Sequence, residues 1–431
     1  MIALLLASLS ASAVMPSIDE VYKHRMNIVE MGQTDQKESR QFGVIENLIQ
    51  GQVETSLANL EARGLNSGVV KSQPWSGHYW ANYSGGLGMR WSDPNFPSDD
   101  WGEGESYVRR NRWNQQYFDA LSPAEKYDYL TGVDPTERGS LTSHQWNLGR
   151  DEYQRTGTVA TWQGICHGWA PASIYLPYPR RDVAFKFPQG NLVLKVDDIK
   201  ALGSLYYANG TYETLFAGYR CNRDDAPTNS EGRVTDPSCF DVNPGDWHLS
   251  LTNLIGARKE PFIIDAAESS EVWNHPVVSY ALEYYDPTNI NARSTSFRSA
   301  LRDITRTPNL RHRQFRSAQT RYVVGVVSTI LINIETMPGA QGDENQQMTF
   351  VYDLELDANL RIIGGEWRDQ ARPDFIWRPR PGTKPSTPAD GIALDMWRMG
   401  DANWRRGSLL NSAKGAPLRA FVEELFRLSA Q

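Results

Sequence analysis

The sequence has few cysteines, no surplus of positive charge and almost no long hydrophobic run. Lys and Arg number 44 against 51 Asp and Glu, which gives a formal net charge of -7. The basic residues are scattered among acidic ones, so no basic stripe exists to neutralise phosphates, and no nucleic-acid partner is expected. After the first residues no apolar run approaches the ~20 residues that span a bilayer, so no membrane partner is expected either.

What is present is the composition of a globular protein. Of the 431 residues, 40% are hydrophobic and 11% are aromatic. This is enough apolar material for one large core or for two to three lobes, and it lacks the depletion that marks disorder. We find no internal repeat.

The N-terminus carries the pattern of an export signal. An apolar run from Ile2 to Leu9 is followed by Ala11-Ser12-Ala13, the small-residue pattern of a cleavage site. The usual positive charges before the run are missing, so a buried N-terminal helix is the alternative. We expect residues 1–13 to be a signal peptide and the protein to be secreted and extracellular.

Three cysteines are an informative number in an exported chain, because oxidising compartments pair thiols and one is left over. Cys221 and Cys239 flank a polar loop that has no apolar period of its own. A disulfide across a loop of this size contributes about 3 kcal/mol in the chain-entropy model. The sequence therefore predicts a disulfide between Cys221 and Cys239 and a free thiol at Cys166.

Residues 14–70 form a helical N-terminal region in our interpretation. Apolar residues recur at three and four positions between Ile45 and Leu60, and Gly64 follows as a C-cap. This amphipathic helix is either part of an inhibitory propeptide or an ordinary packing helix, and the pattern does not separate the two.

The main body is predicted to be an α+β catalytic core over residues 71–385, with a helical lobe at 71–180 and a β-rich lobe at 181–385. A helix is expected from Ser122-Pro123, and another from Asp198 to Tyr207. Residues 386–431 form a C-terminal strap and helix. The expected strands are Val183 to Phe187, Leu192 to Val196, His248 to Ile255, Phe262 to Asp265, Val277 to Tyr285, Tyr322 to Ile334, Met348 to Leu356 and Arg361 to Trp367.

The strongest candidate for chemistry is Cys166. The segment after Gly164 passes into small and apolar residues that can start a helix at the cysteine. A thiol at a helix N-terminus meets the positive end of the dipole and free N–H groups, which lower its pKa and also hold an oxyanion. We expect Cys166 to be a nucleophile, with a buried inert thiol as the alternative.

His248 is the expected base. It follows Pro244-Gly245-Asp246 and precedes alternating leucines, a pattern that suggests the first residue of a strand. His167 is adjacent to Cys166, but consecutive helical residues point about 100° apart, so it is a poor base for that thiol.

Asp265 is the expected third member, because it ends an apolar strand seventeen residues after His248 and can fix the tautomer of the imidazole. Asp246 and Asn253 are its rivals. Asp246 is too close in sequence to fold back easily, and Asn253 lies well along the predicted strand.

Four neighbours are expected to shape the site. Trp162 and Gln163 precede the cysteine, and Trp273 and Asn274 follow the aspartate. They supply candidates for an oxyanion donor and for a hydrophobic wall that excludes water. Either tryptophan is also consistent with plain core packing.

At these residues the sequence resembles the transglutaminase elicitor family, over roughly Gln73 to Trp377. The motifs that carry the resemblance follow one another in a fixed order. They are PWSGHYW at 74–80, SPAEKYDYLTG at 122–132, GICHGWAPA at 164–172, GDWHLSLTNLIG at 245–256, VWNHPV at 272–277 and IGGEWRDQARPDFIW at 363–377.

The resemblance implies a secreted cross-linking enzyme with a papain-like core and a Cys-His-Asp site at Cys166, His248 and Asp265. It further implies protein substrates, with glutamine as acyl donor and lysine as acceptor, and Ca²⁺ as an activator. The plant-elicitor segment of the family typically reads VWNQPVRG, whereas this chain has His275, Val278 and Ser279 at three of those positions. No dense Ca²⁺ loop is visible, so no metal ligand and no other cofactor is predicted.

Two other functions fit the same sequence. A papain-like cysteine endopeptidase shares the thiol, the acyl-enzyme and the oxyanion hole, and differs only in the second nucleophile. A secreted binding or adhesin protein on the same fold would use the Trp- and Tyr-rich loops for recognition, and its Cys166 would be unreactive. The sequence predicts no oligomeric state.

Overall fold

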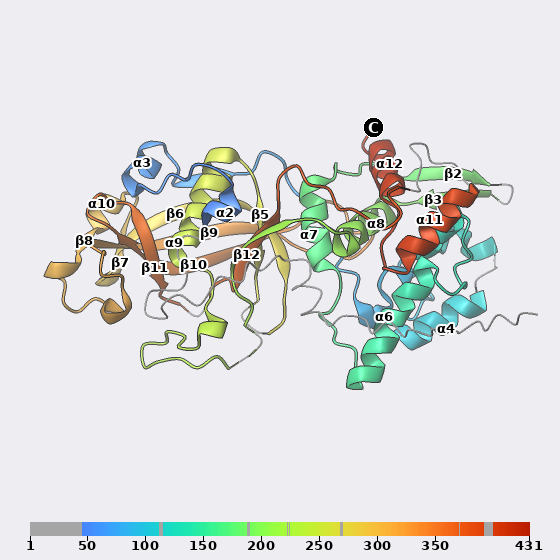
Figure 1. Ribbon diagram of the computed structural model, residues 1–431, viewed down its shortest axis with the longest axis horizontal. Coiled ribbons are helices and arrows are strands. Elements are labelled where there is room, and N and C mark those ends of the chain that lie inside the picture. Colours follow the sequence, from blue (N-terminus) through green and yellow to red (C-terminus); the bar gives the residue numbers. More distant parts are fainter. Residues whose placement is uncertain are drawn as a thin grey trace, which may run out of the picture.

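The computed structural model describes residues 45–431 except 112–114, 188–189, 222, 224, 268–269, 370 and 392–399. The molecule is elongated, with a large β-sheet in one half and most of the helices in the other (Figure 1). The predicted signal peptide lies outside the described residues. Within them, no helix has the length and apolarity to cross a membrane.

The large sheet is antiparallel, with the strand order β11-β10-β9-β6-β5-β12-β4. β1 and β7 pair with β6, β8 pairs with β9, and β2 and β3 form a separate hairpin. The bounds are β1 Ser67–Val69, β2 Val183–Phe187, β3 Gly190–Leu194, β4 Thr214–Gly218, β5 Phe262–Asp265, β6 Asn274–Asp286, β7 Asn289–Ser294, β8 Arg302–Asp303, β9 Tyr322–Asn333, β10 Asn345–Leu356, β11 Ile362–Trp367 and β12 Phe375–Pro379. Seven of the eight predicted strands are confirmed within a few residues.

The helices cover one face of the sheet and build the other half of the molecule (Figure 1). The α-helices are α2 Ile45–Ile49, α3 Leu57–Ala62, α4 Trp101–Asn111, α5 Pro123–Thr131, α6 Leu141–Thr156, α7 Cys166–Tyr175, α8 Val196–Asn209, α9 Pro244–Ser250, α10 Phe297–Ala300, α11 Ala402–Ser412 and α12 Arg419–Ser429. A π-helix, Leu251–Arg258, continues α9. The predicted mixture of helices with an antiparallel sheet is therefore confirmed.

The start of α5 shows how the sequence sets a helix boundary. Ser122 accepts a hydrogen bond from the backbone N–H of Glu125, and the Glu125 side chain accepts one from the backbone N–H of Ser122. Pro123 occupies the first helical position, where its missing N–H costs nothing. The helix predicted from Ser122-Pro123 is confirmed.

The prediction of a strand from His248 to Ile255 is wrong, because this segment is helical in α9 and the π-helix. Asn243 caps α9 by accepting from the backbone N–H of Gly245 at 2.8 Å, and Pro244 is at the first helical position. The leucines that suggested a strand are all fully buried, because core surrounds this helix on several sides. The Asn-Pro start signal was the better guide.

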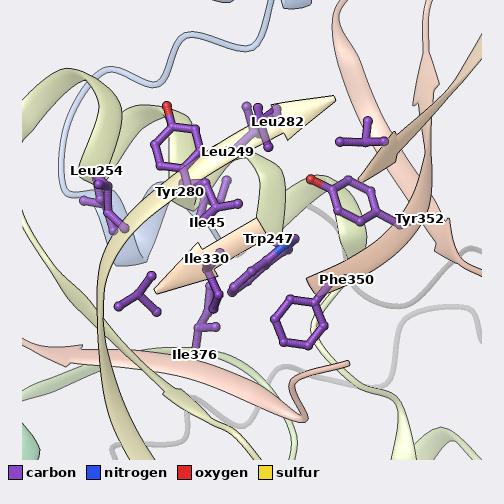
Figure 2. Close-up of a cluster of buried hydrophobic side chains, with 14 of the residues drawn as sticks. Ile45, Trp247, Leu249, Leu254, Tyr280, Leu282, Ile330, Phe350, Tyr352 and Ile376 are labelled. Carbon is purple, nitrogen blue, oxygen red and sulfur yellow. The ribbon is translucent and has the colours of Figure 1, made fainter. Parts of the chain in front are cut away.

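The core of the sheet half lies between α9 and the strands. Trp247 is packed against Phe350, with ring centroids 5.2 Å apart, and neither side chain is more than 1% exposed. Ile330 and Ile376 contribute from β9 and β12 to the same cluster (Figure 2). This cluster fixes the sheet against α9.

The described part of the N-terminal region belongs to this core. It contains two short helices, α2 and α3, instead of the single amphipathic helix that we predicted. Gly51 separates them with a φ of +130°, a backbone conformation that L side chains rarely adopt. The Arg378 side chain donates to the carbonyls of Leu48 and Ile49 at the end of α2. Residues 45–62 are thus packing elements of the folded protein.

The disulfide between Cys221 and Cys239 is confirmed, with Cα atoms 4.4 Å apart. It closes the polar loop around a small cluster with Val234. Cys166 is free, as predicted from the count of three cysteines, and it is buried, which was not predicted.

Candidate active site

Cys166 is the first residue of α7, as the sequence predicted. The helix begins there because the preceding turn is tied to the segment around Tyr79, whose carbonyl accepts a hydrogen bond from Ile165 N–H at 2.6 Å. Gly164 lies so close to the same carbonyl that a side chain at this position would collide with it. Figure 1 shows α7 where the sheet half meets the helical half.

The thiol is enclosed by the start of β6 and the residues before it. Cys166 is only 4% exposed. Its Sγ donates to the carbonyl oxygen of Val272 at 3.5 Å and accepts from Nδ2 of Asn274 at 3.5 Å. The thiol therefore has a proton acceptor on one side and an amide donor on the other.

The electrostatics of the thiol differ from our expectation. Burial raises the pKa of Cys166 to about 12, and the negative charges of Glu335 and Asp265 add to this shift. The hydrogen bond from Asn274 acts in the opposite direction. We had expected the helix N-terminus to lower the pKa of Cys166, but desolvation of the thiolate raises this pKa by more than the helix dipole lowers it. With its pKa raised in this way, the thiol is neutral at pH 7.

Asn274 is the best-defined amide of the site. It lies at the start of β6 and is fully buried. Nε1 of Trp377, which can only donate, is 2.7 Å from Oδ1 of Asn274. The oxygen is therefore the accepting end, and the NH₂ group faces Cys166. The predicted role of Asn274 as a site-shaping amide is compatible with this geometry.

Asp265 is close to the thiol but is not held against a histidine. It is in register with Asn274 across the β5–β6 ladder. Its Oδ1 accepts from the backbone N–H groups of Trp273 and Ala267, at 2.9 and 3.2 Å. Its Oδ2 is buried and has no hydrogen-bond partner within the described residues. Burial raises the pKa of Asp265 to about 8.

His248 does not approach the thiol, which corrects our assignment of the base. Its Nδ1 is 3.0 Å from the hydroxyl of Tyr352 in the core of the sheet half. Tyr352 is in register with Val326, and Val326 is in register with Tyr284 of β6. Tyr284 is ten residues along β6 from Asn274, or about 33 Å at the rise of a strand. The side chains cannot bridge that length.

The rivals for the third position are equally remote. Asp246 and Asn253 lie on α9 and the π-helix that follows it. Asn253 donates to the carbonyls of Leu249 and Glu54 and accepts from the backbone N–H of Glu54. It therefore ties the π-helix to the N-terminal region.

The other residues predicted to shape the site, Trp162, Gln163 and Trp273, lie around the N-terminus of α7. The ring of Trp273 meets the ring of Tyr79 edge-on, with centroids 5.2 Å apart, and Trp273 is partly exposed. Trp162 is also partly exposed, and the Arg220 guanidinium lies over its ring. The carbonyl of Gln163 accepts from Asn82 N–H, and its side-chain amide lies beside the Glu152 carboxylate.

Two residues near the thiol, His275 and Glu335, were not predicted from the sequence to belong to the site. His275 follows Asn274, and its Nδ1 is 3.1 Å from the carbonyl oxygen of Asn333 and 3.5 Å from Oε2 of Glu335. The His275 ring lies edge-on to Trp169 of α7. His275 had been noted only as a departure from the family pattern. Glu335 gave no signal in the sequence, because the chain folds it back to the thiol after β9.

The comparisons with known proteins agree on the class of this fold. A crystal structure of the GP42 transglutaminase from Phytophthora sojae superposes with a TM-score of 0.60 and 21% sequence identity, covering 92% of this chain and 99% of that chain. The fold is thus that of a transglutaminase, a mixed protein with a large antiparallel sheet. The family model described as Transglutaminase elicitor matches residues 42–392, and the chain belongs to this family. No curated protein sequence matches the chain.

Among the residues that the structure describes, no group of three or more His, Cys, Asp or Glu side chains is arranged to hold a metal ion. Ca²⁺ prefers six to eight oxygen ligands. No step below depends on a metal.

Proposed function

We propose that the protein is a secreted protein-glutamine γ-glutamyltransferase in which Cys166 is the nucleophile. The observation that carries the proposal is the free thiol at the start of α7, with the Asn274 amide 3.5 Å from its sulfur. A helix N-terminus and an amide donor beside one sulfur are what an acyl transfer needs to stabilise an oxyanion. A thiol helix against an antiparallel sheet is also the arrangement of a papain-like core.

The reaction has two halves. The sulfur attacks the side-chain carbonyl carbon of a glutamine, and a thioester forms. The amide nitrogen leaves as ammonia and carries away the proton of the thiol. A lysine amine then attacks the thioester, an isopeptide bond forms, and the thiol regains a proton. Export is proposed from the leader at residues 1–13 and from the disulfide between Cys221 and Cys239, since disulfides persist in oxidising compartments.

The proposal is tested by incubating the purified full-length protein with a glutamine peptide and a labelled primary amine, with and without Ca²⁺. We expect release of ammonia and a covalent peptide–amine product in the mass spectrum. Cleavage of backbone amides without amine incorporation would make the protein an endopeptidase. An unmodified peptide together with an unreactive Cys166 would make it a binding protein.

We assign the proton acceptor for the thiol to His275. Nδ1 of His275 faces the Asn333 carbonyl, which can only accept, so the neutral ring carries its proton on Nδ1 and leaves Nε2 as a base. The neutral ring of His78 has the opposite tautomer, because its Nδ1 accepts from Trp80 N–H. Its proton is therefore on Nε2, which is then not available as a base. Proton transfer from Cys166 to His275 belongs to the proposal, since catalytic hydrogen bonds tighten only when substrate binds.

His275→Gln is therefore expected to slow ammonia release about 10²- to 10⁴-fold, the range for removal of a general base. The rate is measured with a glutamine peptide under single-turnover conditions. His248→Gln is the paired variant, since it removes the histidine that the sequence favoured. If the folded His248→Gln protein lost more activity than His275→Gln, the assignment would return to His248.

Trp273 is expected to protect the thioester from water. Water is present at ~55 M and an amine at millimolar levels, so aminolysis needs an advantage of about 6 kcal/mol. Aromatic cover supplies part of this by excluding water and by packing against a lysine stem. We expect Trp273→Ala to raise the ratio of glutamate to isopeptide product about tenfold. Trp101→Ala, which alters an aromatic contact with Tyr153 on α6, is the control and should leave the ratio unchanged.

A further inference from the structure

Two carboxyl groups near the thiol, those of Asp265 and Glu335, each have one oxygen that accepts no hydrogen bond within the described residues. Asp265 and Glu335 both raise the pKa of Cys166 through their negative charge. Oδ2 of Asp265 and Oε1 of Glu335 are buried and have no hydrogen-bond partner within the described residues. A buried carboxyl oxygen without a partner is costly, so each requires an explanation.

The two carboxyl groups differ in access. Asp265 is fully buried and is held by two backbone N–H groups. The Glu335 side chain keeps 15% of its surface exposed. It directly precedes Thr336, which donates to Gly77, and Met337, which is 67% exposed. Glu335 is therefore the more exposed of the two carboxyl groups, and its buried Oε1 is the oxygen left for a ligand.

Aromatic side chains stand next to Glu335. Burial raises the pKa of Tyr79 to about 12, and Tyr83, Glu335 and Cys166 add smaller contributions. Tyr79 packs edge-on against Trp273, and its hydroxyl donates to the carbonyl of Thr161. The backbone brings Glu335 and Cys166 toward Tyr79, because Thr336 N–H donates to the Gly77 carbonyl and Ile165 N–H donates to the Tyr79 carbonyl.

We propose that Glu335 and Tyr79 form the subsite for the acyl acceptor, with Glu335 binding the ammonium group of a lysine side chain and taking its proton. The inference rests on the proposed transferase function. The apolar stem of the lysine lies along Tyr79, and the free Oε1 of Glu335 receives the ammonium. A long apolar stem that ends in a cation is the ligand class that such a site selects.

The proton balance of this step closes within the site. Glu335 accepts one proton from the lysine ammonium and leaves a neutral amine. The amine nitrogen bonds to the thioester carbonyl carbon and the carbon–sulfur bond breaks. The nitrogen transfers its surplus proton to the departing sulfur, and the products are an isopeptide, a free thiol and a protonated Glu335. Burial raises the pKa of Glu335 to about 8, which suits a group that exchanges protons near neutral pH.

Oε2 of Glu335 has a separate role as a neighbour of His275. Nδ1 of His275 is closer to the Asn333 carbonyl, at 3.1 Å, than to Glu335, at 3.5 Å. Glu335→Gln keeps an oxygen at this position and removes the carboxylate. Because the Glu335 charge also raises the pKa of Cys166, any effect of the substitution on thioester formation is common to both acceptors and is measured separately as hydroxamate formation.

The test compares two acceptors in the Glu335→Gln variant. One is a peptide with a single lysine, which is cationic at pH 7, and the other is hydroxylamine, which is mostly neutral and has no stem. We expect the KM for the lysine peptide to rise about 10- to 100-fold, as for a lost charged hydrogen bond. Hydroxamate formation should fall much less than this, because hydroxylamine uses neither the charge nor the stem subsite.

Three results are distinguishable. No product from either acceptor with the wild-type protein refutes the transferase function itself. Equal losses with both acceptors in Glu335→Gln refute the subsite, because the residue then acts on the thiol or on the fold. An unchanged KM for lysine refutes it as well. Glu283→Gln, an exposed acid on β6, is the control for charge alone, and Tyr79→Leu should raise the lysine KM by a larger factor than it lowers hydroxamate formation.

Discussion

Amine incorporation is expected to fall about 10⁴-fold or more in Cys166→Ala, because no other group in the site can form the thioester. Cys166 is the one free cysteine among the three in the chain, and the other two form a disulfide. Without a covalent intermediate, an amide donor and a binding site give only weak catalysis. The measurement is the rate of labelled-amine transfer to a glutamine peptide.

The Cys166→Ala protein should stay folded. The substitution removes a single buried sulfur atom, which costs about 1 kcal/mol, a small part of the free energy of unfolding of a typical domain. Thermal unfolding and the integrity of the Cys221–Cys239 disulfide provide the control. Transfer at a rate comparable with that of the wild-type protein would eliminate Cys166 as nucleophile.

Deletion of residues 14–64 is expected to unfold the sheet half instead of activating the enzyme. Five apolar side chains of this region are at most 2% exposed and belong to the main core, namely Ile45, Leu48, Ile49, Leu57 and Leu60. Each contributes about 1.5–3 kcal/mol by burial, so their joint loss matches the whole stability of a typical domain. The outcome is measured by circular dichroism and by the yield of soluble protein.

Deletion of residues 14–44 alone is the matched control, because it keeps all five side chains. If this shorter deletion raised the activity, an inhibitory role would belong to the segment before α2. A single substitution, Leu48→Ala, should cost about 2–5 kcal/mol if the region is structural. A stable and active protein lacking residues 14–64 would show that these helices are dispensable.

The sequence was a reliable guide where the signal is local. The start of α5 at Ser122-Pro123 and the disulfide loop were both predicted, since each depends on residues close together in the chain. The start of α7 at Cys166 was also predicted from the small residues around Gly164. The match of the family model confirms the resemblance that the ordered motifs indicated.

The failure at His248 has a physical cause. Alternating leucines look like one face of a strand, yet α9 is surrounded by core, and such a helix buries residues on all sides. Spacing along the chain then suggested that His248 and Asp265 lie on neighbouring strands. The helix instead carries His248 to Tyr352, at the far end of β6 from the thiol.

By itself the sequence determined the free thiol at Cys166, the disulfide and the family, because each depends on residue identity or on a local pattern. Only the tertiary structure decided which groups meet at the sulfur. The antiparallel ladder brings Asn274 and Asp265 into register beside the sulfur of Cys166. The segment after β9 brings Glu335 toward the same sulfur. Burial, which is a property of the whole fold, then raises the pKa of the thiol above the value that its helix position suggested.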